Sequence, residues 1–342
     1  MADLVWIKFL FCGALIVYSG SRLSLYGDII AEKTGLGRTW IGLVLMAMVT
    51  SLPELVTGVS AVVLVNVPNI ALGDAIGSCV FNLLLLALLD ILHGPEPIFS
   101  KADQGHVLSA SFGIMLLTLV LLGILAAQLG YPLTVLWFGI YTPAILLLYL
   151  LAMRVTYMFE QRKIAAYLKE SAALELRYDR VSTREAVRWY ILHALVIVGA
   201  GTWLPAIGEE LARRMQWTQS FVGGLFIAAT TSLPEVVTSV AAIRLGALNM
   251  GVSNLLGSNI FNMGIVAVDD LFYAAGPILA TASAAQMIPG IVAVLMTAIA
   301  SAGLIYRSQK KALMRLSWDG IALVGMYAIY MLLLYNTRAA GG

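Results

Sequence analysis

The chain has 342 residues, of which 60% are hydrophobic and only 12% are charged, and its formal net charge is +2. Average soluble domains carry about 25% charged residues, so this composition excludes an ordinary soluble protein and favours one embedded in lipid. The small net charge does not indicate a nucleic-acid partner, and we predict none.

Apolar runs long enough to cross a bilayer, about 20 residues each, recur along the whole chain. We therefore predict an all-α membrane protein in which lipid surrounds about ten transmembrane helices. The first run follows Asp3 rather than a basic segment, and no clear small-residue cleavage site comes after it, so we expect it to be retained. The predicted spans are 4–26, 41–65, 69–92, 105–128, 131–152, 189–211, 219–243, 249–273, 280–305 and 318–336.

The distribution of basic residues predicts the orientation. The one long connection, 153–188, carries eight Lys and Arg residues against five acids, and the connection before the last span adds four more. Basic connections stay in the cytoplasm, which places both termini outside. Only four of the 21 basic residues then lie on the outer side: Lys8, Arg213, Arg214 and Arg338.

Two short motifs each occur twice. Thr-Ser-Leu-Pro-Glu at 50–54 recurs at 231–235, and Gly-Ser-Cys-Val-Phe-Asn at 77–82 is matched by Gly-Ser-Asn-Ile-Phe-Asn at 257–262. The offsets, 181 and 180 residues, divide the chain into a first repeat (1–152), a cytoplasmic connecting loop (153–188) and a second repeat (189–342). Five spans per repeat is an odd number, so the second repeat is inverted relative to the first. Inverted repeats of this kind place the substrate at the bilayer midplane with alternating access.

The repeated residues bring oxygen atoms into the membrane. A carboxylate in a membrane helix is costly and is by default a functional hypothesis, and here Glu54 and Glu235 recur with their motif. Residues four apart share a helix face, so each Glu lies on the same face as a Thr, and each motif Ser on the same face as an Asn. The prolines interrupt the helical hydrogen bonding and free main-chain carbonyls.

An all-oxygen site of this kind suits hard cations. Oxygen-only coordination favours Ca²⁺ or an alkali ion over zinc or copper, and neither His nor Cys recurs with the motifs. The two cysteines, Cys12 and Cys79, give no disulfide framework and no zinc spacing. Two negative charges match one divalent ion or balance several monovalent ions.

The paired motifs resemble those of the sodium/calcium exchangers of the cation/Ca²⁺ antiporter superfamily, and the resemblance covers essentially the whole chain. It implies a non-enzymatic antiporter that moves Ca²⁺ outward against inward Na⁺, with no cofactor. It also implies main-chain carbonyl ligands two turns before each Glu. The implied ligands are Ala47, Thr50, Ser51, Glu54, Ser78 and Asn82 in the first repeat, and Ala228, Thr231, Ser232, Glu235, Ser258 and Asn262 in the second.

The chain departs from the family pattern in several places. Cys79 replaces a motif Asn that Asn259 retains, and we expect Cys79 to pack rather than to bind an ion. Acids follow both motifs: Asp90 lies twelve residues after Ser78, and Asp270, preceded by Asp269, lies twelve after Ser258. These acids either line the mouths of an ion pathway or cap and pair helix ends, near opposite membrane faces.

A second pair of polar residues also corresponds between the repeats. Asp74 and Asn254 each lie four residues before a motif Ser. One turn from a ligand, they either line the ion path or cap the start of a helix.

Three other functions compete with Na⁺/Ca²⁺ exchange. A H⁺/Ca²⁺ antiporter would keep the same fold and use H⁺ as the coupling ion. An intramembrane hydrolase would need one catalytic pair rather than two repeated ligand sets, and a channel would need a continuous pore. A compact chain without a regulatory domain favours a prokaryotic inner membrane.

Overall fold

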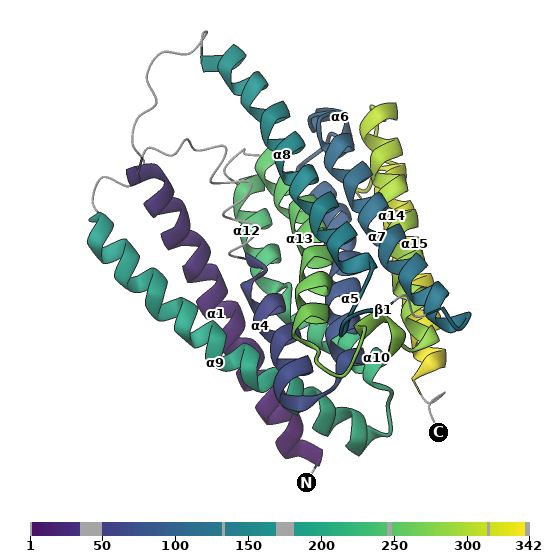
Figure 1. Ribbon diagram of the computed structural model, residues 1–342. Coiled ribbons are helices and arrows are strands. Elements are labelled where there is room, and N and C mark those ends of the chain that lie inside the picture. The colour runs from purple at the N-terminus through teal and green to yellow at the C-terminus, as the bar shows by residue number, and fades with distance from the viewer. Residues whose placement is uncertain are drawn as a thin grey trace.

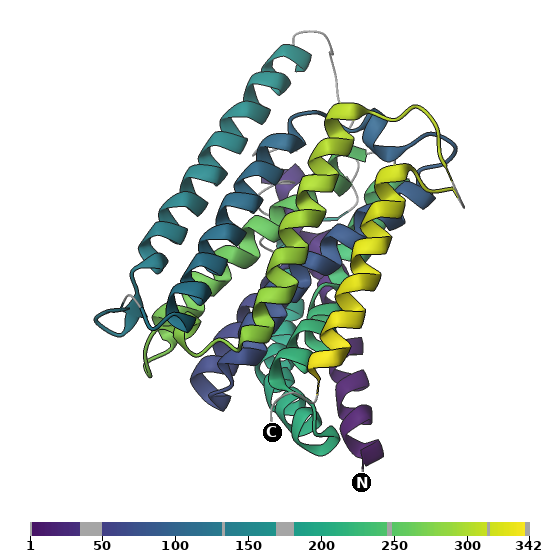
Figure 2. The same cartoon turned by 90° about the vertical axis from the view of Figure 1, so that its right-hand side faces the viewer.

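The computed structural model describes residues 2–34, 50–131, 134–168, 181–244, 248–312 and 315–338. The described chain is a bundle of long tilted helices, seen from two sides in Figures 1 and 2. Within those ranges the strands are limited to β1 (Thr134–Val135) and β2 (Phe138–Gly139), which pair antiparallel. The predicted all-α class is confirmed.

Both halves of the chain are helical in the described residues. Those of the first half are α1 (Ala2–Thr34), α4 (Leu52–Ser60), η2 (Ala61–Val65), α5 (Pro68–Leu92), α6 (Ile98–Lys101), α7 (His106–Gln128) and α8 (Tyr141–Leu168). Those of the second half are α9 (Thr183–Met215), α10 (Gln219–Phe221), η3 (Val222–Ile227), α11 (Ala228–Thr231), α12 (Leu233–Arg244), α13 (Leu248–Phe272), η4 (Ile278–Ala280), η5 (Ala284–Gln286), α14 (Met287–Tyr306) and α15 (Trp318–Thr337).

Lengths and apolar content agree with a multi-pass membrane protein. In the described part of the chain, seven helices are long and apolar enough to cross a membrane. The pair Gln219–Thr231 and Leu233–Arg244, bent by 41°, brings the number to eight if it is one broken span rather than a re-entrant loop. Two shorter apolar helices, Leu52–Val65 and Tyr141–Thr156, occupy the two remaining predicted positions.

One predicted span boundary was wrong. The fifth span was expected at 131–152, but residues 134–139 form the β1–β2 hairpin and α8 begins only at Tyr141. Helical patterning was also expected within the 153–188 connection, and α8 continues into it to Leu168 while α9 begins within it at Thr183. The apolar pattern marks where lipid contact ends, whereas the helical hydrogen bonding continues beyond it.

Local sequence explains several helix starts. Pro53 and Pro68 stand in the first turn of α4 and α5, where a missing N–H costs nothing. Ser182 and Ser317 cap α9 and α15 by accepting hydrogen bonds from the backbone N–H groups of Glu185 and Gly320.

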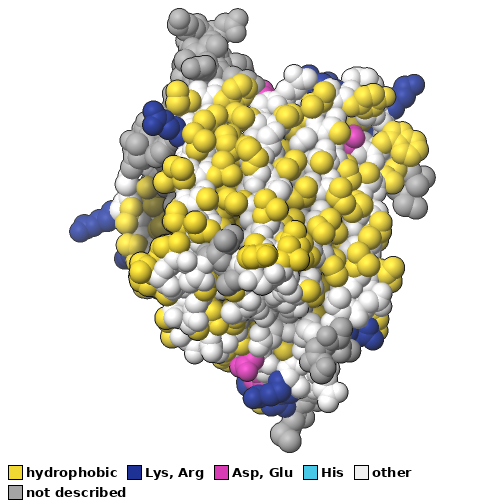
Figure 3. All heavy atoms as spheres, turned by 45° about the vertical axis from the view of Figure 1, so that its right-hand side comes forward, with side chains coloured by type: hydrophobic (Ala, Val, Ile, Leu, Met, Phe, Trp, Pro, Cys, Tyr) yellow, Lys and Arg dark blue, Asp and Glu magenta, His cyan; other side chains and the backbone are white. Residues whose placement is uncertain are grey.

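The two halves run in opposite directions where they meet. α1 and α9 pack side by side and antiparallel (Figure 1). α1 begins and α15 ends at the same end of the bundle, while α8 ends at the opposite end. Figure 3 shows one face of the molecule, where a broad hydrophobic surface has charged side chains mainly towards its edges. Such a surface is what contact with lipid requires.

Glycines allow the two repeats to approach closely at the centre. A Cβ built on Gly77 of α5 would lie 2.5 Å from the carbonyl oxygen of Gly224 in η3. One built on Gly73 would lie 2.8 Å from the Gly224 nitrogen, and one on Gly223 would lie 2.7 Å from the Ile70 carbonyl oxygen. Backbone therefore meets backbone here, as small residues permit in membrane helices.

Candidate cation site

The Thr-Ser-Leu-Pro-Glu motifs interrupt helices near the middle of the bundle. Ser232 (φ −84°, ψ 5°) separates α11 from α12, and Ser51 (φ −89°, ψ 13°) precedes α4 with nearly the same geometry. Irregular backbone at membrane depth is tolerated where protein or a polar cavity surrounds it. Both serines are fully buried.

The two motif carboxylates are held reciprocally across the repeats. Ser51 donates a hydrogen bond of 2.9 Å to Glu235 Oε1, and Ser232 donates one of 3.0 Å to Glu54 Oε1. Ser258 adds a donor at 3.3 Å to Glu235 Oε1. Both Glu side chains are buried, with exposures of 1% and 0%. The site is therefore built from both repeats at once.

The Gly-Ser motifs bring α5 and α13 to the same place. Ser78, Asn82, Ser258 and Asn262 are all fully buried. Ser78 donates to Asp74 Oδ1 and to the Ala228 carbonyl oxygen, both at 3.4 Å. We use the name central site for these four residues together with Thr50, Ser51, Glu54, Thr231, Ser232 and Glu235.

Two residues outside the predicted ligand set belong to this polar cluster. Asp74 Oδ1 accepts a 2.8 Å hydrogen bond from the Thr231 hydroxyl, and Asn254 Oδ1 lies 3.4 Å from the Thr50 hydroxyl oxygen, its donor. Asn254 also donates to Thr238 and Ser239. Both lie inside long helices rather than at helix starts, so the capping alternative is wrong. Their matched spacing was the signal in the sequence.

One contact was not predicted from the sequence. Asn82 Nδ2 donates to Asn259 Oδ1 at 3.1 Å, and Asn259 Nδ2 donates to the Cys79 carbonyl oxygen at 3.2 Å. The Cys79 thiol is buried and approaches carbonyl oxygens of Ala75 and Asn259, which agrees with a packing role. Only the folded chain brings α5 and α13 together here.

Of the two predicted main-chain ligands, the Ala47 and Ala228 carbonyls, the structure describes one. The Ala228 carbonyl accepts from the Ser78 hydroxyl, which places it beside the central site. Ala47 lies outside the described residues, so its carbonyl stays a prediction.

Unpartnered oxygens give the central site its capacity for cations. Within the described chain, six buried atoms of the central site and of the adjoining Asp74 have no hydrogen-bond partner: Glu54 Oε2, Glu235 Oε2, Asp74 Oδ2, Asn82 Oδ1, and Asn262 Oδ1 and Nδ2. Buried polar atoms are normally paired, and five of these six are oxygens. An oxygen-only set with carboxylates fits Ca²⁺ or Na⁺.

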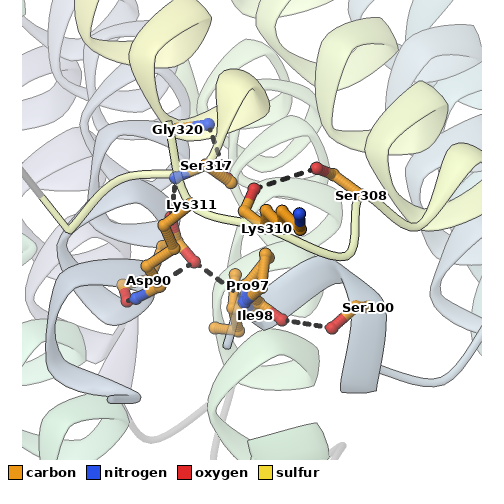
Figure 4. Close-up of polar contacts among 9 residues, drawn as sticks. All are labelled: Asp90, Pro97, Ile98, Ser100, Ser308, Lys310, Lys311, Ser317 and Gly320. Carbon is orange, nitrogen blue, oxygen red and sulfur yellow. Dashed lines mark hydrogen bonds and ion pairs between the residues drawn. The ribbon is translucent and has the colours of Figure 1, made fainter. Parts of the chain in front are cut away.

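Asp90 pairs and caps helix ends, outside the central site. Its carboxylate accepts from the backbone N–H of Ile98 at 2.8 Å and of Ser317 at 2.6 Å. Lys311 lies 3.7 Å from Oδ1 and also donates to the Asp90 carbonyl oxygen (Figure 4). Burial lowers the pKa of the Lys311 ammonium. Asp90 thus fastens the start of α15 to the end of α5.

Asp270 performs the same task in the second repeat. It accepts from the Ile278 N–H at 2.6 Å, the Gly139 N–H at 2.8 Å and the Tyr141 hydroxyl at 3.0 Å, and also from Thr142. Asp270 thus fastens the start of α8. Ile98 belongs to α6, and Gly139 belongs to β2, the strand paired with β1. α6 and β1 lie at opposite ends of the bundle (Figure 1). For Asp90 and Asp270 the pairing alternative is therefore confirmed.

Comparison with known proteins decides the family. The model of the family described as sodium/calcium exchanger protein matches residues 4–158 and 186–336. The chain belongs to this family. It is a multi-pass membrane transporter, a cation/Ca²⁺ exchanger, with Na⁺ and Ca²⁺ as the transported ions of the family.

Relatives include proteins of bacteria, archaea and mammals. The chain is 29% identical to the inner membrane protein YrbG of Escherichia coli over 255 residues, 74% of each chain. It is 28% identical to an uncharacterized membrane protein of Methanocaldococcus jannaschii, covering 78% of this chain and 82% of the relative. Human sodium/potassium/calcium exchanger 3 is 32% identical over 149 residues, 43% of this chain and 22% of the relative.

Solved structures agree with the fold. The sodium-calcium exchanger NCX_Mj, soaked with Na⁺ and Sr²⁺, superposes with a TM-score of 0.59 at 26% identity. The match covers 97% of this chain and 99% of that structure. The match supports the predicted fold, an all-α membrane protein of about ten transmembrane helices.

Proposed function

We propose that this exchanger moves Ca²⁺ against Na⁺ by alternating access at the central site. The observation that carries the proposal is the reciprocal pairing of Ser51 with Glu235 and of Ser232 with Glu54. Each carboxylate is held by a hydroxyl from the opposite repeat, so relative movement of the repeats would open and close the site.

The proposed ligands are the central-site residues with the Ala47 and Ala228 carbonyls. Their unpartnered oxygens would bind either one Ca²⁺ or several Na⁺, because the negative charge of the two carboxylates balances the positive charge of either set of ions. Competition for the same oxygens couples the two fluxes, since neither ion can occupy the site while the other does. The repeats 1–152 and 189–342 would enclose the ions between them.

The proposed orientation places the termini outside and the 153–188 connection in the cytoplasm of a prokaryotic inner membrane. The distribution of Lys and Arg supports it. In this orientation, the hairpin end of α8 faces outward and the Asp90–Lys311 contact faces the cytoplasm.

The test is uptake of radiolabelled Ca²⁺ into proteoliposomes that contain the purified chain. One set is loaded with Na⁺, a second with choline at matched pH, and a third with choline under an imposed pH gradient. Uptake that requires internal Na⁺ is expected. Uptake driven by the pH gradient without Na⁺ would overturn the proposal in favour of H⁺/Ca²⁺ antiport.

A further inference from the structure

Asp269 is a buried carboxylate that neither the central site nor the helix-end contacts use. Its side chain is 0% exposed, and no described residue offers either oxygen a hydrogen bond. No described Lys, Arg or His forms an ion pair with it. An isolated buried carboxylate is very costly, so a cation or a proton must neutralise it.

The geometry of α13 places Asp269 on the same helix face as Asn262 of the central site. Residues seven apart on a helix lie on nearly the same face, so Asp269 shares the face of α13 that carries Asn262. The separation is about 10 Å along the axis at ~1.5 Å per residue. Neither amide atom of Asn262 has a partner in the described chain. Two unpartnered polar side chains thus follow one another along one face.

On α4, the residue opposite Asp269 is Gly58, one turn beyond Glu54. A Cβ built on Gly58 would lie 2.5 Å and 2.8 Å from the two carboxylate oxygens of Asp269. The absence of a side chain at residue 58 is therefore what makes room for this carboxylate between α4 and α13. Any larger residue would occupy that space.

The other acids nearby differ from Asp269 in what they already bind. Asp270 is saturated by its contacts with the starts of α8 and η4. Asp74, which lies within electrostatic range of Asp269, accepts two hydroxyls on Oδ1 and keeps Oδ2 unpartnered. Among the buried acids of the described chain, Asp269 is the one with both carboxylate oxygens unpartnered.

The pair formed by Asp269 and Gly58 has no counterpart at the corresponding positions of the other repeats. The offset of 180 relates Asp269 to Leu89, which is buried, and the offset of 181 relates Gly58 to Ser239. The fold therefore accepts an apolar side chain at this position, and packing does not require a carboxylate. A buried acid facing a glycine therefore occurs between Asp269 of the second repeat and Gly58 of the first, whereas the corresponding residues are Leu89 and Ser239.

We propose that Asp269 binds a monovalent cation, Na⁺, at an additional site between α4 and α13. One free carboxylate supplies one charge, whereas Ca²⁺ takes six to eight oxygens. The site lies on the half of α13 nearer the hairpin, so in the proposed orientation it stands between the central site and the outside. This inference rests on the proposed function only for the identity of the ion.

The test counts Na⁺ ions bound by the purified full-length chain, using radiolabelled Na⁺ and scintillation proximity. Asp269→Leu, which copies Leu89, is expected to bind one Na⁺ fewer per chain than the unmodified protein. The matched control is Asp319→Asn, because Asp319 also packs against a glycine, Gly303, and also has an unpartnered oxygen in the described chain. The control is expected to keep the full number.

Equal numbers of Na⁺ in Asp269→Leu and the unmodified chain would overturn the proposal. If Asp269→Leu does not give a monodisperse protein, Asp269→Asn replaces it in the same assay. A protonated-carboxyl infrared band that persists at saturating Na⁺ and disappears in Asp269→Asn would also overturn it, in favour of a proton. The binding assay does not depend on transport. If the unmodified chain showed no Na⁺-driven Ca²⁺ uptake, that result would contradict the proposed function but not the Na⁺ site at Asp269.

Discussion

Hydroxyl groups from one repeat hold the carboxylates of the other, and this reciprocity can be tested residue by residue. Glu54 and Glu235 occupy corresponding positions and receive corresponding donors. The environments differ in detail, since Glu235 also accepts from Ser258 whereas Asp74 lies near Glu54. We expect similar but unequal contributions to ion binding.

Replacing either central carboxylate should abolish exchange. Glu54→Gln and Glu235→Gln keep the side-chain volume but remove the charge that balances the ion. We expect Na⁺-dependent Ca²⁺ uptake to fall to the level of empty liposomes in each variant, with normal membrane insertion. Full uptake in both variants would remove these residues from the site.

Ser51 and Ser232 should contribute similarly to the affinity for Ca²⁺. A hydrogen bond to a charged group contributes about 1.5–3 kcal/mol, so Ser51→Ala and Ser232→Ala should each reduce the apparent Ca²⁺ affinity about tenfold or more. The control is Ser111→Ala, because among the described residues the Ser111 hydroxyl bonds to the Val107 carbonyl of its own helix and to nothing else. An effect confined to one of the two serines would argue against the reciprocal arrangement.

At the scale of helices, glycines determine how closely the repeats pack. Gly20 of α1 lies against Pro234 of α12, and a Cβ there would come within 2.4 Å of the proline ring. Gly201 of α9, 181 residues later, lies against Val56 of α4, and a Cβ built there would come within 3.0 Å of the Val56 side chain. The first helix of each repeat thus packs on the motif helix of the other.

A glycine comparison tests the central approach. Gly77→Ala would place its Cβ 2.5 Å from the backbone oxygen of Gly224, so α5 and η3 must separate. We expect a lower thermal stability and reduced transport. Gly113→Ala in α7, where nothing lies within 4 Å, should be neutral or stabilising by about 1 kcal/mol from helix propensity. The measurement is the melting temperature of both purified variants.

Helix-end carboxylates provide a second test at this scale. Asp270→Ala leaves the buried N–H groups of Gly139 and Ile278 without their acceptor, at about 1–3 kcal/mol for each. We expect destabilisation large enough to lower the melting temperature by several degrees. An unchanged melting temperature would show that α8 is held in place by other contacts.

For the whole molecule, the testable property is the orientation of the bundle. Cys12 and Cys79 are buried, so the unmodified chain should resist a membrane-impermeant maleimide. In intact cells we expect Arg338→Cys, at the end of α15, to be labelled from outside, and Arg184→Cys, at the start of α9, only after permeabilisation. The reverse pattern would invert the proposed orientation.

Much of this architecture could be predicted from the sequence because its signals are local. Apolar runs of the length of a bilayer mark the spans, and duplicated motifs mark the two halves and their polar residues. The matched positions of Asp74 with Asn254, and of Asp90 with Asp270, also stand in the sequence, although their roles do not. Helix boundaries were less accurate, since a helix continues where lipid contact ends.

Only the tertiary structure decided which atoms meet. The pairing of Ser51 with Glu235, the Asn82–Asn259 contact and the anchoring of α8 and α15 all join residues more than 100 positions apart. Sequence spacing defines faces on one helix but not the partner helix. Likewise, Asp269 next to Asp270 looks like one acidic pair, yet packing saturates one carboxylate with donors and leaves its neighbour buried against Gly58 with no donor among the described residues.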